Sequence, residues 1–186
     1  MNKVFAHPRK GLSSFASYGD TFKPKAKDFM YSLSALKPWM AFFSIWLSYL
    51  EKRGWRYKMD VDALTIAQQL GKDIHFLEQI EEQLEALDSI PLARIVQFLK
   101  KIRHWNTYAG VYVKYYLKGD LEHLMSVAKD FPSRCESVID KRDHVLYERM
   151  RVFFEKGNAI AFVGAPHVKE IKKMLFRDGY EVAQLF

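Results

Sequence analysis

The stretch from Asn158 to His167, Asn-Ala-Ile-Ala-Phe-Val-Gly-Ala-Pro-His, constrains the fold of this chain more than any other. Ala159–Val163 is a short apolar run with β-branched and aromatic members, which is typical of a strand buried on both faces. Gly164 ends the run, and Pro166 favours a tight turn or the first turn of a helix. His167 follows the carboxyl end of this strand, where open α/β sheets place their ligands. It is therefore a candidate site residue, although a single histidine there is also compatible with a structural role.

Residues 168–177 carry apolar side chains at helical spacing, and the apolar run 181–186 predicts a second strand. A right-handed crossover would make strands 159–163 and 181–186 parallel. Residues 74–77 form a third strand candidate, with Glu78 at its carboxyl end. The expected fold class is α/β, helix-rich with a small, largely parallel sheet ending in a β-α-β unit. The other expected helices cover residues 27–36, 38–52, 60–70, 78–87, 91–117, 121–128 and 133–156.

The length of 186 residues favours one domain, which we expect over 27–186, preceded by a flexible basic arm over 1–26. The net charge of +7 suits a nucleic acid or an anionic lipid, but a basic tail with solvated helix faces explains it better. Cys135 is the only cysteine, which excludes an intramolecular disulfide and a cysteine-based zinc site. We see no signal peptide, and the most apolar window, Trp39–Leu50, is about half a membrane span in length. These features predict a cytoplasmic protein without a membrane span.

Arg142 is a second candidate, because helical spacing places it on one face with Leu146 and Phe153. A guanidinium among apolar neighbours needs a carboxylate, carbonyl groups or a ligand anion. The same spacing is compatible with a site arginine and with a structural salt bridge. A tyrosine stripe between Tyr108 and Tyr116 predicts core or interface packing rather than a base-stacking surface.

Several short strings occur in the order and spacing of a known family. The chain resembles the TraB/GumN family (TraB, PrgY, GumN and Tiki-like proteins), which is similar to the erythromycin-esterase clan. The resemblance covers residues 36–186 and looks like the carboxyl-terminal portion of the family fold. The strings that carry it are Leu36–Trp39, Gly71–Glu78 with Glu81–Pro91, Ile139–Asp143, and Val163–His167 with the closing Leu175, Gly179, Tyr180 and Val182.

The resemblance implies an α/β fold and, for some members, metal-dependent peptidase or hydrolase activity. His167 would then be a metal ligand or catalytic base, and Gly164 would belong to the cofactor-binding Gly-x-x-His motif. Arg142 would hold a substrate anion or stabilise negative charge. Glu78 would supply a carboxylate at the same sheet edge, as a catalytic group and metal ligand. The implied cofactor is a divalent metal ion of unknown identity.

The chain departs from the family pattern in ways that bear on function. The first Gly-x-x-His motif and the acidic strand after it are absent, and the family's Leu-Glu-Thr reads Leu77–Gln79 here. Catalytic zinc normally keeps three protein ligands, so one histidine and one carboxylate would hold a metal weakly. The first hypothesis is therefore a truncated or degenerate relative with an incomplete site. The alternatives are a hydrolase completed by a second chain or copy, and a basic nucleic-acid-associated protein.

The expected partners follow from the same observations. Loss of the opening strands would leave a sheet edge open, and an open edge invites pairing. Together with the aromatic residues of Trp39–Leu50 and Tyr108–Tyr116, this predicts a homodimer. The ligand we expect is a peptide or small molecule, and we do not expect nucleic acid as a partner.

Overall fold

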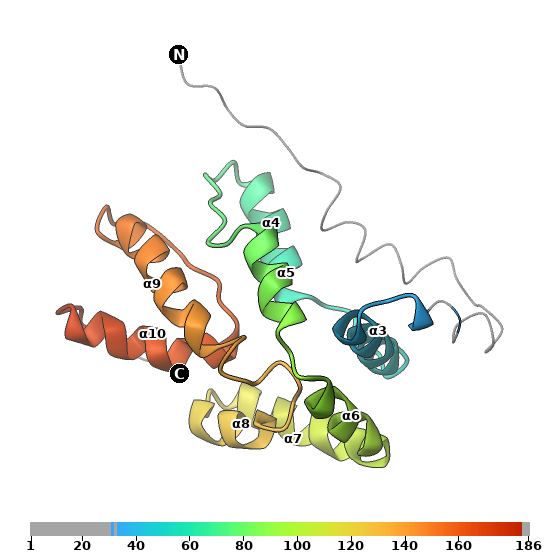
Figure 1. The fold of residues 1–186 in the computed structure, drawn as a ribbon. Coiled ribbons are helices and arrows are strands. Elements are labelled where there is room, and N and C mark those ends of the chain that lie inside the picture. Colours follow the sequence, from blue (N-terminus) through green and yellow to red (C-terminus); the bar gives the residue numbers. More distant parts are fainter. Residues whose placement is uncertain (1–30, 32, 184–186) are drawn as a thin grey trace. The chain divides into compact units, whose positions relative to one another are not determined.

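The computed structural model describes residues 31 and 33–183 (Figure 1). The chain divides into two compact units, Met1–Trp55 and Arg56–Phe186. The expected basic arm, 1–26, lies outside the described residues, as do positions 184–186 of the last expected strand.

The described part of the first unit consists mainly of helix α3, Pro38–Glu51. Pro38 occupies the first turn, where its missing N–H costs no hydrogen bond. Trp46 stacks on Tyr49 at 5.7 Å between ring centroids, and the Arg53 guanidinium lies 3.6 Å from the Tyr49 ring centroid. The bounds of α3 confirm the helix predicted over 38–52. Across the described residues of both units, no helix has the length and hydropathy that crossing a membrane requires.

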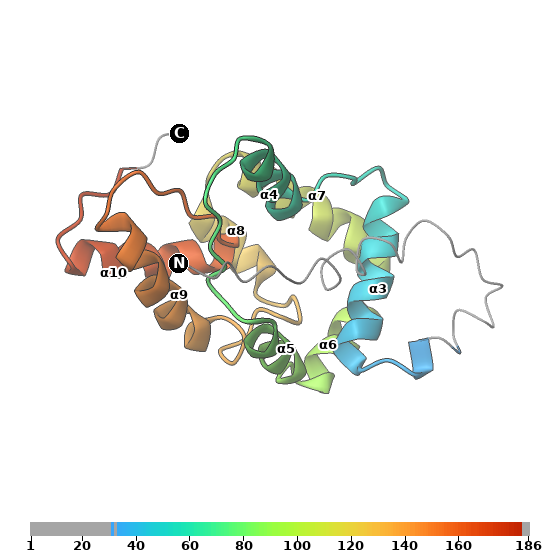
Figure 2. The same ribbon diagram turned by 90° about the horizontal axis from the view of Figure 1, so that it is seen from above.

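The described part of the second unit is built from helices (Figure 2). Helix α8 coincides with the predicted 121–128, and the Asp120 side chain caps it by accepting from the His123 amide. The predicted 91–117 helix is interrupted at residues 101–104. The helices are α4 (Met59–Gln69), α5 (Ile80–Asp88), α6 (Leu92–Lys100), the 3-10 turn η1 (Ile102–His104), α7 (Trp105–Leu117), α8 (Leu121–Ala128), α9 (Asp140–Phe154) and α10 (Ala165–Arg177).

The α/β fold class was wrong, because residues 31 and 33–183 contain no strand or sheet. The segments 74–77, 159–163 and 181–183 have irregular conformation. Of the expected β-α-β unit, the described residues therefore contain the helix, α10, without the strands. The physical reason is that an apolar run indicates burial, whereas a strand also needs a neighbour to complete its hydrogen-bond ladder. Leu77, Ala161 and Val163 achieve partial burial by packing against helices instead.

Two groups of buried and half-buried side chains hold the second unit together. Helices α9 and α10 pack side by side around Leu146, Tyr147, Met150 and Ile171 (Figure 1). Burying each such side chain contributes about 1.5–3 kcal/mol. The second group is aromatic and joins α6, α7 and the residues after α8, with members Phe98, Trp105, Tyr108 and Phe131. The tyrosine stripe of α7 thus begins in the core, as predicted, and continues outward as a stacked Tyr112–Tyr116 pair.

Candidate functional site

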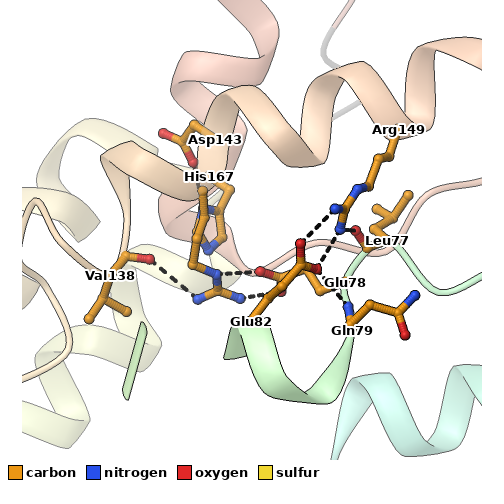
Figure 3. Close-up of polar contacts among 9 residues, drawn as sticks. Leu77, Glu78, Gln79, Glu82, Val138, Asp143, Arg149 and His167 are labelled. Carbon is orange, nitrogen blue, oxygen red and sulfur yellow. Dashed lines mark hydrogen bonds and ion pairs between the residues drawn. The ribbon is translucent and has the colours of Figure 1, made fainter. Parts of the chain in front are cut away.

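His167 lies in the first turn of α10 and contacts Asp143, in the first turn of α9 (Figure 3). Its Nδ1 is 2.5 Å from Oδ1 of Asp143. The side chains of His167 and Asp143 are 8% and 5% exposed, respectively. Gly164 precedes α10 with φ −61° and ψ 140°, which turns the chain from the 159–163 segment into the helix. The pair therefore joins the amino-terminal ends of two packed helices.

Local sequence explains why a carboxylate is buried here. Asp143 is followed at helical spacing by Leu146, Tyr147 and Met150, the buried face of α9. Burial raises the pKa of the Asp143 carboxyl group, and the hydrogen bond with His167 opposes that rise. Oδ2 of Asp143 is buried without a hydrogen-bond partner among the described residues.

The contact has a defined chemical consequence. When the Asp143 carboxylate accepts the Nδ1 proton of His167, the imidazole is fixed in orientation, and Nε2 becomes the basic atom. Nε2 makes no hydrogen bond to any residue that the structure describes. A carboxylate-oriented imidazole of this kind can act as a general base or as a ligand.

A second polar pair lies beside the first on α9. The Arg142 guanidinium donates from Nε to Oε1 of Glu78 at 2.6 Å, and from its second terminal nitrogen to Oε2. It also donates to the carbonyl of Val138 at 3.3 Å. The side chains of Arg142 and Glu78 are 19% and 15% exposed, respectively. Glu78 is thus the partner that the Arg142 guanidinium needs. The guanidinium occupies both oxygens of the Glu78 carboxylate.

A third pair fixes the segment that carries Glu78. Arg149 of α9 donates to both Glu82 oxygens at 2.6 Å and to the carbonyl of Leu77 at 2.8 Å (Figure 3). Glu82 also accepts from the Gln79 amide at 2.8 Å and closes a capping box at the start of α5. The hydrogen bond from Arg149, followed by the one from the Gln79 amide, lowers the pKa of Glu82 to about 2. These contacts attach residues 77–82 to α9.

The model of the TraB/PrgY/gumN family matches residues 12–184. The chain belongs to this family. The resemblance in the sequence strings is thereby confirmed, and the match extends into the segment expected to be a basic arm. Comparisons with curated proteins and with solved structures gave no significant match.

Of the site residues expected in this TraB/PrgY/gumN-family chain, the structure brings Glu78 and Arg142 into direct contact. His167 is bound to Asp143, and no hydrogen bond or ion pair among the described residues joins it to Glu78 or Arg142. The expected three-residue cluster is therefore two adjacent pairs, linked because Arg142 and Asp143 are consecutive on α9.

The donors expected to bind a metal ion do not by themselves fit one. Both Glu78 oxygens bind Arg142, so of the expected donors only Nε2 of His167 has no hydrogen bond to a described residue. Within the described ranges, no group of three or more His, Cys, Asp or Glu side chains could hold a metal ion. Structural and catalytic zinc centres use three or four protein ligands, which these residues do not supply.

Asp143 is the site residue that sequence reasoning missed. It occurs in the family-like string Ile139–Asp143, but the site role in this string was assigned from the sequence to its neighbour Arg142. A signal was present, because Asp143 precedes Leu146, Tyr147 and Met150 at spacings of three, four and seven. A carboxylate on the apolar stripe of a helix must be paired when buried, and a histidine is a suitable partner.

Proposed function

We propose that this TraB/PrgY/gumN-family chain is a degenerate relative of metal-dependent hydrolases, with an incomplete catalytic site, that binds a peptide or small molecule without cleaving it. The observation that carries the proposal is the bidentate Arg142–Glu78 pair. A carboxylate engaged at both oxygens by a guanidinium has its negative charge neutralised and is a weaker ligand for a metal ion. Among the described residues, the only carboxylate with a hydrogen bond or ion pair to His167, the second ligand candidate, is its own partner Asp143.

The test is metal analysis of the purified chain combined with peptide and ester hydrolysis assays. We expect substoichiometric metal, and hydrolysis rates that are the same for the wild type and His167→Ala. His144→Ala is a matched control, because His144 lies on the same helix as Asp143 and its side chain is 72% exposed. Stoichiometric metal in the wild type would overturn the proposal, and so would wild-type hydrolysis above background. Circular dichroism of His167→Ala separates loss of a ligand from loss of the fold.

The Asp143–His167 pair favours a second candidate function, a hydrolase whose site is completed by another chain or copy. A buried carboxylate that orients an imidazole is the arrangement that general-base catalysis uses. Such an enzyme would lose at least about 100-fold in rate without its base. Specific activity would also rise with protein concentration, because assembly would create the site.

The two functions give different results in one titration. Hydrolysis per chain is measured from nanomolar to high micromolar protein, for the wild type and for His167→Ala. A rate per chain that stays at background throughout is the result expected for a chain that does not cleave its ligand, and it counts against the assembled hydrolase. A rate per chain that rises with concentration in the wild type, and stays flat in His167→Ala, supports the assembled hydrolase and rejects the first proposal.

A further inference from the structure

The segment Ala159–Val163 has the side-chain pattern of a strand but no strand beside it. Ala161 and Val163 pack against the α9–α10 cluster, whereas Ile160 and Phe162 are 84% and 56% exposed. Over residues 160–163 this alternation has the period of two that a strand with one covered face shows.

The path of the chain is compatible with an extended segment here. Asp143 and His167 join the amino-terminal ends of α9 and α10, so the connection between the helices must return along α9 (Figure 1). From Asp143 to Phe154 the helix rises about 17 Å, at 1.5 Å for each of eleven residues. Five extended residues cover a similar distance, about 17 Å at 3.3 Å each.

The backbone of this segment offers hydrogen-bonding groups that the described residues do not use. No backbone hydrogen bond to another described residue involves residues 159–163, and the next one along the chain joins the His167 amide to the Gly164 carbonyl at 3.0 Å. Residues 158–166 contain no charged side chain. Natural edge strands usually carry charges, prolines or bulges that prevent pairing, and the interior of this segment carries none of these protections.

We propose that a second copy of this chain pairs with the segment, antiparallel, around a two-fold axis at Ala161. In this register Ile160 lies opposite Phe162 of the partner subunit, and the same pair recurs on the other side of the axis. A β-branched residue opposite an aromatic one is a favourable cross-strand pair. Each of the two large exposed side chains of the segment thereby gains an apolar neighbour.

The sequence of the segment selects a second copy over an unrelated extended peptide. Any peptide supplies backbone donors and acceptors, but the two-fold register matches the side chains of this segment to themselves. The absence of charge in residues 158–166 also matters, because two copies each carrying +7 can approach there without placing like charges face to face. The inference does not rest on either function proposed above, because it uses only the segment and its packing.

Sedimentation velocity over 1–300 µM full-length chain tests the pairing. We expect a monomer–dimer equilibrium, weakened at least tenfold by Phe162→Lys, which places a charge beside Ile160 of the partner subunit. Phe176→Lys is the matched control, because Phe176 is 53% exposed on α10 and lies outside the segment. A monomer at every concentration overturns the proposal, and so does equal weakening by the two variants.

A cross-link tests the register and remains informative if the lysine variants unfold. Ala161→Cys, made together with Cys135→Ser, should give a disulfide-linked dimer on mild oxidation, because the two copies of residue 161 face each other across the axis. Phe176→Cys in the same background should stay monomeric. Dimers that form without cross-linking of Ala161→Cys would show that another surface is used and would overturn the assignment.

Discussion

The ion pairs of this chain differ in the solvent exposure of their side chains. The side chains of Asp143 and His167 are 5% and 8% exposed, those of Glu78 and Arg142 15% and 19%, and those of Lys101 and Asp130 both 54%. Removing one partner of a buried pair leaves a charge or polar group without water or a counter-ion. Removing one partner of an exposed pair returns the other to solvent at little cost. The same substitution should therefore have very different effects at the three sites.

The first prediction is a ranking of alanine substitutions by their effect on the free energy of unfolding. His167→Ala should cost about 3–5 kcal/mol, because it leaves Asp143 buried and unpaired. Arg142→Ala should cost about 1–3 kcal/mol, and Lys101→Ala less than about 1 kcal/mol. Urea denaturation followed by circular dichroism measures all three. Equal costs at the three sites would contradict the burial argument.

Arg94 of α6 binds the connection between α8 and α9. Its Nε donates to the carbonyl of Pro132 at 3.2 Å, and one terminal nitrogen donates to the carbonyls of Lys129, Phe131 and Arg134 at 2.6, 3.0 and 2.8 Å. Carbonyl groups after a helix have no partner within that helix, and here one guanidinium supplies several of them. The contact thus fixes the path of the chain between α8 and α9.

Arg94→Lys should destabilise the chain by about 2–4 kcal/mol, because an ammonium group cannot reproduce the planar fork of donors. Hydrogen exchange of residues 129–134 should accelerate more than exchange in α10. Arg103→Lys, an exposed arginine in η1, is the control and should change stability by less than about 0.5 kcal/mol. Unchanged exchange in residues 129–134 would show that other contacts hold this connection.

Prediction from sequence succeeded for helices and failed for strands, for a physical reason. The hydrogen bonds of α8 all lie within a few residues of one another, so local spacing and the Asp120 cap suffice to predict it. The run 159–163 has the composition of a strand, but a strand forms only with a neighbour that no local pattern reveals. Likewise, spacing showed that Arg142 needs a partner without showing that Glu78 supplies it.

For the molecule as a whole, buried tyrosines link stability to alkaline pH. Tyr147 is fully buried and donates to Oδ2 of Asp178 at 2.6 Å. Burial, followed by the hydrogen bond to Asp178, raises the pKa of Tyr147 from 10.0 to about 12. Burial also raises the pKa of Tyr108, in the aromatic cluster of α6 and α7. The folded chain therefore keeps protons that the unfolded chain releases above about pH 10.

Stability should consequently fall as pH rises from about 10 to 12, because a raised pKa in the folded state favours unfolding once the unfolded tyrosines ionise. Tyr147→Phe should cost about 1 kcal/mol at neutral pH, through loss of the bond to Asp178, and should make the alkaline decline shallower. Tyr57→Phe is the control, since Tyr57 is 92% exposed. Thermal unfolding between pH 8 and 12, with tyrosinate absorbance at 295 nm, measures both effects. If Tyr147→Phe and the wild type lose stability with the same slope above pH 10, the proton held by Tyr147 is not the cause of the decline.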